Sequence, residues 1–254
     1  MQSSPPELRI RIFADGADLA GIADLARDPR IAGFTTNPTL MRQAGVRDYA
    51  RFARDVLALV PDRPVSFEVI ADDLDGIERQ ALTIAGWGAN AWVKVPVTTT
   101  AGTPCAPVVR RLALRGVRVN VTAILTLAQV RALTEAMPED APAIFSVFAG
   151  RIADTGRDPV PLMRAALAVM AARPRTELLW ASPREVLNVY QADAAGCHII
   201  TCTADLLRKL ALRGRDLAAY SLETVAMFRR DALAAGYAVP ADAAFAVAHA
   251  TAAE

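Results

Sequence analysis

The chain has 254 residues, of which 53% are hydrophobic, and its 28 Lys and Arg residues nearly balance its 27 Asp and Glu residues. This composition excludes a disordered chain, and the net charge of +1 gives no reason to expect nucleic acid or an anionic membrane as a partner. The N-terminus does not resemble a signal peptide and no apolar run is long enough to span a bilayer, so we expect a cytoplasmic protein.

Short apolar segments rich in β-branched residues alternate with segments that have the 3.6-residue spacing of amphipathic helices. The predicted strands are 8–15, 33–37, 65–70, 91–97, 117–124, 141–148, 176–182 and 197–201. Eight such units favour an α/β fold, a single (β/α)8 TIM barrel, with a doubly wound open sheet as the alternative. We expect residues 1–254 to form one domain, in which about 215–254 is a C-terminal helical extension packed on the barrel or on a neighbouring subunit.

The fourth predicted strand, AWVKVPV, carries a lysine among apolar residues. Two of the 28 basic residues are lysines, Lys94 and Lys209, and arginine supplies every other positive side chain. A buried ammonium costs free energy unless it is paired or loses its proton. A desolvated lysine, unlike an arginine, can act as a neutral amine nucleophile. Lys94 is therefore the first candidate for a catalytic residue.

Polar side chains collect near the carboxyl ends of the predicted strands, where barrel enzymes place their active sites. The period-two spacing of a strand turns pairs such as Ser66 and Glu68 to the same face. In a barrel these side chains would therefore converge with Lys94 at one mouth. The side chains concerned are Asp15, Thr36, Asn37, Ser66, Glu68, Asn120, Thr122, Ser146 and Ser182.

This set of residues predicts chemistry at a ketone. A neutral Lys94 amine attacks the ketone and loses water to form an imine, and the protonated imine is an electron sink for carbon–carbon cleavage beta to it. Asp15 and Glu68 are the carboxylates available to move protons. Asn37 and Asn120 are suited to bind substrate hydroxyls or a water.

The cysteines and histidines indicate neither a metal site nor a disulfide. Cys105, Cys197 and Cys202 form no CxxC pair, and we interpret them as reduced, mostly buried thiols. His198 and His249 stand far apart in the sequence, away from any cluster of ligands. We therefore predict no metal and no cofactor.

Several of these residues also have a structural explanation when taken alone. A single buried lysine such as Lys94 is usually paired or extended toward solvent, and Glu68 would then be its partner. Asn37 fits a strand end and turn, and Asp15 fits a helix N-cap. The combination favours the catalytic interpretation, because each residue lies at the same end of a different strand.

Basic residues follow the sixth and seventh predicted strands, where barrels often bind phosphate. Arg151 and Arg157 lie in FAGRIADTGRD, and Ser182 and Arg184 lie in ASPRE. Arginine presents paired donors that match a phosphate group, although surface ion pairing is the alternative for each. Arg151 and Arg184 are preferred because each closely follows a strand, whereas Arg157 is predicted to be solvated.

Four segments together resemble a known family. GFTTNPTL, WVKVPVT, FSVFAGRI and WASPREV…AGCHIIT are similar to motifs of the transaldolase family, which includes the small fructose-6-phosphate aldolases. The resemblance runs in order from about Ile12 to Thr201. It implies a class I, Schiff-base (β/α)8 enzyme that acts on ketose phosphates.

The resemblance implies a role for each matching residue. Lys94 would form the imine, Asp15 would be the acid and base for carbon–carbon cleavage, and Glu68 would activate the water used in imine formation and hydrolysis. The remaining positions would bind substrate or water: Asn37, Asn120 and Ser146 the dihydroxyacetone portion, Thr122 the catalytic water, and Arg151, Ser182 and Arg184 the phosphate.

Two positions distinguish activities within the family. The aldolases typically have glutamine at the place of Glu68 and tyrosine at the place of Phe148, so both residues here are of the transaldolase type. An apolar Phe148 offers no hydroxyl to assist release of free dihydroxyacetone, which favours transfer to an acceptor aldehyde. The alternatives are a fructose-6-phosphate-type aldolase and a catalytically inactive sugar-phosphate-binding barrel.

The sequence also departs from the family pattern. Pro183 stands where an aromatic residue is common, so the phosphate loop is expected to differ, and Trp180 is expected to add bulk beside the mouth. These differences concern the identity of the sugar. The resemblance implies small-molecule sugar phosphates as partners and a homo-oligomer.

Overall fold

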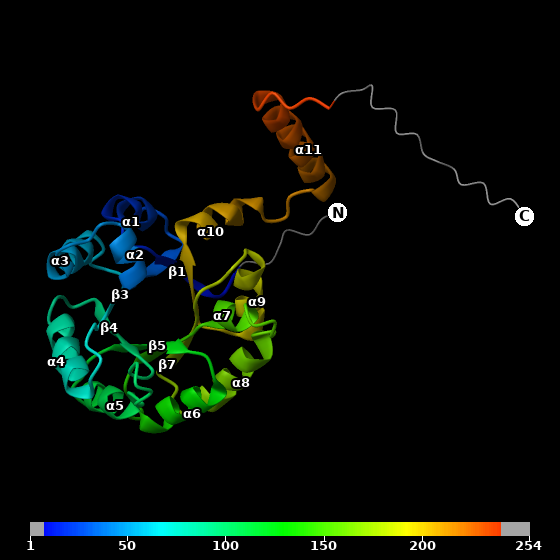
Figure 1. The fold of residues 1–254 in the computed structure, drawn as a ribbon. Helices are drawn as coiled ribbons and strands as arrows, with labels where there is room; N and C mark the ends of the chain where they lie inside the picture. Colours follow the sequence, from blue (N-terminus) through cyan, green and yellow to red (C-terminus); the bar gives the residue numbers. More distant parts are fainter. Residues whose placement is uncertain (1–7, 240–254) are drawn as a thin grey trace, which may run out of the picture. The chain divides into compact units, whose positions relative to one another are not determined.

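Eight parallel strands close into a barrel in the order β1 to β8 (Figure 1). The structure is a computed structural model and describes residues 8–239. Its strands are β1 (Arg11–Asp15), β2 (Ile31–Thr35), β3 (Val65–Glu68), β4 (Ala91–Pro96), β5 (Val119–Ile124), β6 (Ala143–Val147), β7 (Thr176–Trp180) and β8 (Ile199–Thr203). The predicted (β/α)8 barrel is confirmed. The alternative of an open sheet is wrong, because β8 pairs with β1.

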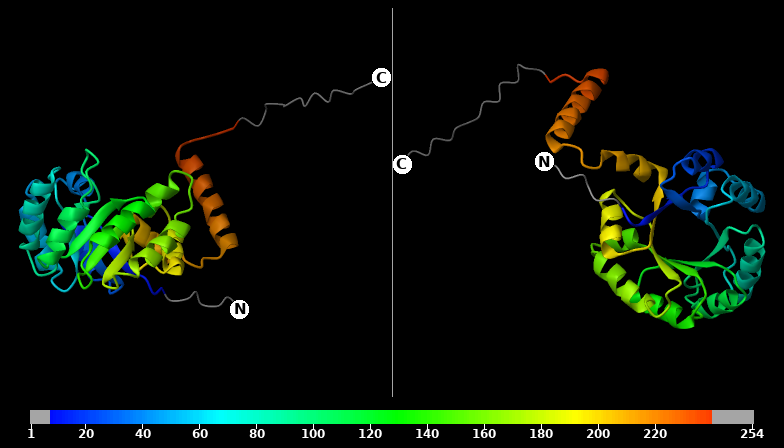
Figure 2. Two further views of the ribbon diagram at one scale, coloured as in Figure 1. Left: turned by 90° about the horizontal axis from the view of Figure 1, so that it is seen from below. Right: turned by 180° about the vertical axis from the view of Figure 1, so that it is seen from behind.

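Helices of the first compact unit, from α1 to α10, cover the outside of this barrel (Figures 1 and 2). The helix α3 shows how they pack: it buries an apolar stripe of Phe52, Val56 and Leu57, whose spacing matches the helical repeat. The described helices are α1 (Leu19–Ala26), α2 (Pro38–Gln43), α3 (Tyr49–Leu59), α4 (Leu74–Ala85), α5 (Ala106–Leu114), α6 (Leu127–Ala136), α7 (Ala149–Ala153), α8 (Val160–Met170), α9 (Leu187–Ala195), α10 (Ala204–Lys209), the 3-10 helix η1 (Leu210–Leu212) and α11 (Leu217–Ala234).

The strands are apolar on both faces because each face meets a different layer. On β7, Leu179 joins Phe13 in a cluster separate from the main core, to which Trp180 belongs together with many helix residues. Trp180 is fully buried and does not line the cavity at the mouth, so the expected bulk beside the mouth is wrong. Gly33 on β2 leaves room for the Phe13 ring, which a Cβ at this position would approach to 2.6 Å.

The second strand ends two residues earlier than predicted, at Thr35. Asn37 is the N-cap of α2, where its side-chain oxygen accepts the Leu40 N–H at 2.9 Å. Pro38 follows in the first turn of the helix, where its missing N–H is tolerated. These two residues therefore end the pairing of β2 with β3 and begin helix α2.

The chain divides into two compact units, Met1–Ala211 and Leu212–Glu254. The second unit contains α11, which begins after Asp216, whose carboxylate caps the helix. The predicted C-terminal helical segment is confirmed to this extent. Residues 240–254, including His249, lie outside the described part, and the assignment of the whole chain to one domain stays a prediction.

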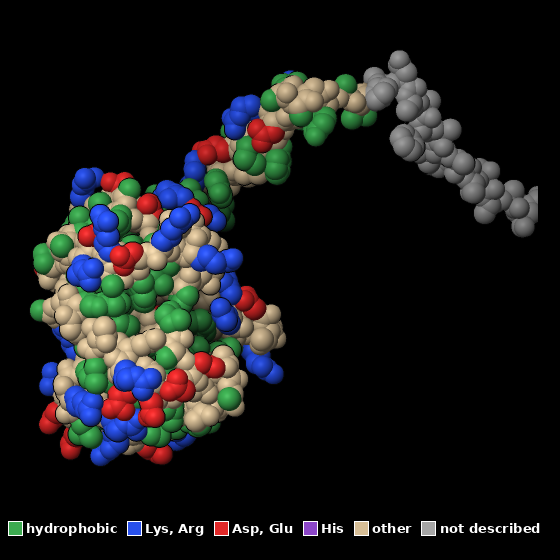
Figure 3. Space-filling view, turned by 60° about the vertical axis from the view of Figure 1, so that its left-hand side comes forward, with side chains coloured by type: hydrophobic (Ala, Val, Ile, Leu, Met, Phe, Trp, Pro, Cys, Tyr) green, Lys and Arg blue, Asp and Glu red, His purple; other side chains and the backbone are tan. Residues whose placement is uncertain are grey.

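The surface carries charges of both signs. Lys and Arg side chains are intermingled with Asp and Glu side chains on the face drawn in Figure 3, and pairs such as Arg111 with Glu78, 2.7 Å apart, recur. Within residues 8–239, no helix combines the length and apolar character needed to cross a membrane.

Candidate active site

A cavity of about 490 Å³ opens at the carboxyl ends of the strands, the end that carries the chemistry in barrel enzymes. It brings together most of the residues predicted to converge there, whereas Thr36, Ser66 and Asn120 are buried and do not line it, so their predicted place at the mouth is wrong. The predicted residues that line it are Asp15, Asn37, Glu68, Lys94, Thr122, Ser146, Phe148, Arg151, Ser182 and Arg184.

Lys94 is held between a carbonyl and a carboxylate. The register of β3 with β4 places Glu68 beside Lys94. The Lys94 Nζ atom donates to the Thr36 carbonyl oxygen at 2.9 Å and lies 3.3 Å from Glu68 Oε2. Lys94 is 6% exposed, so these interactions act in a medium of low polarity. The amine is thereby fixed at a wall of the cavity.

Asp15 ends β1 and receives two hydrogen bonds. The Thr35 hydroxyl donates to Oδ1 at 2.8 Å, and the Asn37 side-chain amide lies 3.5 Å from Oδ2. Burial raises the pKa of Asp15 above its ordinary value, although the Lys94 charge and both hydrogen bonds act in the opposite direction. The N-cap explanation is wrong, because Asp18 caps α1. Asp15 is thus a carboxyl group suited to holding and releasing a proton.

Asn120 lies in the barrel wall behind the cavity lining. Its side-chain amide donates to the Ser66 hydroxyl at 3.0 Å, and the Ser146 hydroxyl donates to its side-chain oxygen at 2.6 Å. All three residues are buried, and of the three Ser146 lines the cavity. Asn120 therefore fixes the orientation of the Ser146 hydroxyl.

Strand β5 is irregular where it reaches the cavity. Its pairing with β6 shifts between Val121 and Ile124, and Ala123 has a left-handed φ of 61°. Such irregularities re-aim side chains next to active sites. The Thr122 hydroxyl beside this shift is buried and has no hydrogen-bond partner among the described residues. It faces the same cavity as Lys94 and is free to bind a polar group there.

Two arginines lie at the end of the cavity near β6 and β7. The Arg151 guanidinium stands 5.0 Å from the centre of the Phe148 ring. Arg184 Nε donates to Asp154 Oδ1 at 3.0 Å, and hydrogen bonds from this arginine lower the pKa of Asp154. Ser182, which also lines the cavity, has a left-handed φ of 61°. Two positive charges are thus available to an anionic group.

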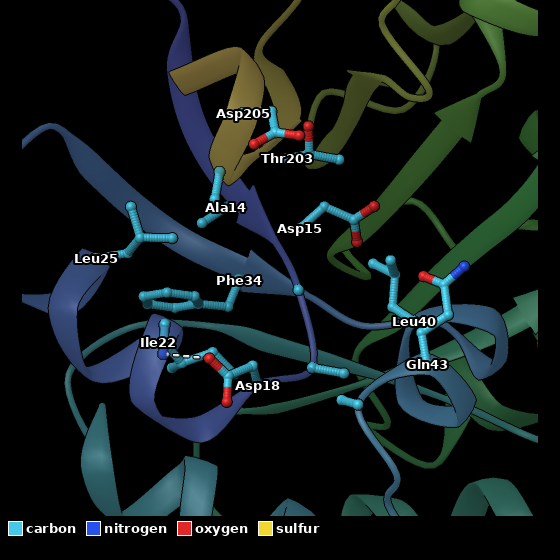
Figure 4. A pocket seen from close by; sticks show the side chains of 15 residues that line it. Ala14, Asp15, Asp18, Ile22, Leu25, Phe34, Leu40, Gln43, Thr203 and Asp205 are labelled. Carbon is cyan, nitrogen blue, oxygen red and sulfur yellow. Dashed lines mark hydrogen bonds between the residues drawn. The ribbon is translucent and has the colours of Figure 1, made fainter. Parts of the chain in front are cut away.

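Several polar residues on the lining were not singled out from the sequence. Thr35 and Thr201 share a hydrogen bond of 2.6 Å between their hydroxyls, and Thr203 and Gln43 also face the cavity. The alternation of Thr201 and Thr203 on β8 is the signal that would have found those two residues. A second, largely apolar cavity of about 450 Å³ adjoins this region and shares Asp15, Gln43 and Thr203 (Figure 4).

Within residues 8–239, the acidic, thiol and imidazole side chains form no group of three or more that would hold a metal ion. Cys105, Cys197 and Cys202 are buried, as predicted, and the structure has each as a free cysteine. Burial raises the pKa of Cys197 to about 12 and that of Cys202 to about 12, so these thiols stay protonated near neutral pH.

Comparison with known proteins agrees with this arrangement. The family model described as Transaldolase/Fructose-6-phosphate aldolase matches residues 12–249. The chain belongs to this family. The resemblance derived from the four sequence motifs is therefore confirmed.

Relatives in the transaldolase/fructose-6-phosphate aldolase family cover most of the chain. A protein from Dehalococcoides mccartyi named "Probable transaldolase" is 32% identical over 202 residues, which are 79% of this chain and 90% of that protein. One of the same name from Roseiflexus sp. (strain RS-1) is 35% identical over 201 residues, 79% of this chain and 88% of that protein.

Solved structures agree on the fold. The crystal structure of KGPDC from Streptococcus mutans in complex with D-R5P superposes with a TM-score of 0.51 at 12% identity, covering 78% of this chain and 88% of that one. At this identity the likeness concerns the barrel alone.

Proposed function

We propose that this chain is a transaldolase that moves a dihydroxyacetone unit from a ketose phosphate to an aldose phosphate through a Schiff base on Lys94. The observation that carries the proposal is the position of the Lys94 amine, 2.9 Å from the Thr36 carbonyl and 3.3 Å from the Glu68 carboxylate, on the wall of a large polar cavity. Family membership supports the same class of chemistry.

The proposed reaction begins at the ketone carbon of the donor. The neutral Lys94 amine adds to this carbon, and loss of the carbonyl oxygen as water leaves the imine. Asp15 then takes the proton of the hydroxyl on the carbon that becomes the aldehyde, while the bond beta to the imine breaks and its electrons move into an enamine. The raised pKa of Asp15 suits it to hold this proton.

Transfer reverses these steps on a second sugar. The enamine carbon attacks the acceptor aldehyde, and Asp15 returns the proton to the new hydroxyl. Water then adds to the imine carbon and the amine leaves, which regenerates Lys94. Glu68 is the group that activates this water, and the Thr122 hydroxyl, buried without a partner in residues 8–239, orients it.

The remaining lining residues hold the substrate in this proposal. Ser146, oriented by Asn120, and Asn37 bind the hydroxyls of the three-carbon unit. The phosphate lies at the other end, where Arg151, Ser182 and Arg184 supply two guanidinium groups and a hydroxyl. When the phosphate binds, Arg184 gives up one of its hydrogen bonds to Asp154 and donates to a phosphate oxygen instead.

A second candidate function is a fructose-6-phosphate-type aldolase that releases free dihydroxyacetone. Phe148 argues against it, because this residue lines the cavity with a ring and no hydroxyl. A product assay separates the two activities. Turnover of fructose 6-phosphate that requires an acceptor aldose phosphate supports transfer, whereas efficient release of dihydroxyacetone without acceptor supports the aldolase.

Borohydride trapping tests the Schiff base directly. Incubation with fructose 6-phosphate and borohydride is expected to leave a reduced three-carbon adduct on Lys94, identified by intact mass and peptide mapping. Lys94→Arg keeps the charge but forms no imine, and Lys209→Arg is the matched control that keeps the adduct. Sugar binding without an adduct from any ketose of a broad panel would instead favour the catalytically inactive barrel.

A further inference from the structure

The ladder between β2 and β3 breaks beside the candidate catalytic residues. Its backbone bonds advance two residues at a time, from Phe34 N–H to the Pro64 carbonyl and from Thr36 N–H to the Ser66 carbonyl, at 2.9 and 3.1 Å. A regular ladder would continue with the Glu68 N–H donating to the Thr36 carbonyl. The Thr36 carbonyl instead accepts from the Lys94 amine at 2.9 Å.

The next bond of a regular ladder is chemically excluded. The Glu68 carbonyl would accept from the N–H of residue 38, which is a proline and has none. The N–H and the carbonyl of Glu68, which both face β2, therefore have no hydrogen-bond partner on β2. Buried backbone groups without partners cost free energy comparable to a lost hydrogen bond.

A single side chain from α3 satisfies both groups. The Tyr49 hydroxyl accepts the Glu68 N–H at 2.7 Å and donates to the Glu68 carbonyl at 2.9 Å. The tyrosine ring is itself fixed by edge-to-face contacts, with ring centres 5.3 Å from Trp87 and 6.3 Å from Phe67. Burial also raises the pKa of Tyr49, which keeps the hydroxyl protonated and able to donate.

We propose that Tyr49 is a positioning residue that replaces the missing β2 partner of Glu68 and so leaves the Thr36 carbonyl free to hold the Lys94 amine. This inference rests on the proposed function for its kinetic consequence. One hydroxyl thereby controls the placement of two groups, the Glu68 side chain at the strand end and the amine across the strand from it.

Tyr49→Phe tests this role because it keeps the ring and removes the hydroxyl. The Glu68 N–H is then expected to turn to the Thr36 carbonyl and displace the Lys94 amine. We expect kcat for transfer to fall about tenfold or more, while KM changes less than twofold, since the phosphate end of the cavity is untouched. Trp87→Phe is the matched control, which weakens the ring contacts, lowers Tm and leaves kcat within twofold.

A second readout is independent of activity. The chain has two lysines, so Lys209 is an internal reference for acylation of Lys94 by acetic anhydride, read by peptide mapping. Loss of the Thr36 acceptor removes the 2.9 Å contact that holds the Lys94 amine against the barrel wall, so the amine is more accessible to the reagent. The Lys94 to Lys209 labelling ratio is therefore expected to rise at least threefold in Tyr49→Phe and to stay unchanged in Trp87→Phe.

The outcomes separate this inference from the proposed function. A lower Tm for Tyr49→Phe with unchanged kcat and labelling ratio would show a structural role alone and overturn the inference. Absence of a borohydride adduct in the unchanged protein would overturn the transaldolase proposal, and the labelling ratio would still decide whether Tyr49 places the amine. Hydrogen exchange of the Glu68 backbone N–H in the unchanged protein is a further test that needs no variant. Rapid exchange would contradict the hydrogen bond from this N–H to the Tyr49 hydroxyl.

Discussion

The Lys94 amine and the Glu68 carboxylate face each other across neighbouring strands at 3.3 Å, in a part of the barrel where both side chains are largely shielded from water. Glu68→Gln keeps the shape of the side chain but removes its charge and its basicity. We expect kcat to fall about 100-fold, which is typical for the loss of a general acid or base. Steady-state transfer kinetics check this value.

Glu177→Gln is the matched control for that substitution. Glu177 is also a strand glutamate, paired with Arg11 and about one-third exposed, and it does not line the cavity. Its activity should stay within twofold of the unchanged protein. Equal losses in the two variants would contradict a catalytic role for Glu68.

Asp15→Asn is predicted to change stability with a definite dependence on pH. Burial raises the pKa of Asp15 in the folded protein above the ordinary 3.8, so the folded state binds this proton more tightly than the unfolded chain. Its contribution to stability is therefore present below pH 3.8 and is lost as pH rises through the folded pKa. Asparagine does not titrate. The stability of the variant relative to the unchanged protein should therefore increase as the pH rises from 4 to 8.

Urea unfolding at both pH values measures this difference, and the same variant should lose at least 100-fold in kcat because an amide does not accept the substrate proton. Asp24→Asn alters an exposed carboxylate paired with Arg27 and serves as the control. A variant whose stability relative to the unchanged protein is higher at pH 4 than at pH 8 would contradict the burial argument.

Ala123→Gly is predicted to stabilise the fold. A non-glycine residue in the left-handed region costs roughly 1–2 kcal/mol, and Ala123 has a φ of 61°. Relief of this strain should raise the free energy of unfolding by about 1 kcal/mol, measured by urea denaturation. Ala143→Gly, in β6 where φ is not positive, should have the opposite sign. A destabilised Ala123→Gly would show that the observed backbone is not strained.

Gly150→Ala is predicted to damage the phosphate end of the cavity. A Cβ at Gly150 would lie 1.6 Å from the Ser182 carbonyl oxygen, so helix α7 must move away from the loop after β7. We expect roughly 3 kcal/mol of lost stability, as for severe overpacking. We also expect a KM for the phosphorylated donor at least tenfold higher, because Arg151 and Ser182 separate. Gly156→Ala, at an open turn, is a control in which KM stays unchanged.

The sequence by itself determined the barrel and the location of its chemistry. Covered parallel strands require near-continuous apolar runs, and these alternate eight times with helical repeats. The lysine in WVKVPVT stands out in such a run. The period-two geometry of a strand then predicts which polar residues near the strand ends share a face with it. Each of these features depends on residues close together in the chain, so the sequence alone predicts it.

The tertiary structure decided which groups touch. Asn120 lies behind Ser146, and Arg184 pairs with Asp154, because contacts between strands and loops depend on register and loop path rather than on local spacing. Tyr49 reaches the backbone of Glu68, which is 19 residues away, only after α3 has packed on the barrel. The sequence does not reveal this role, because Tyr49 replaces hydrogen bonds that β2 does not make to Glu68. One of those bonds is excluded because Pro38, at the start of α2, has no N–H to donate.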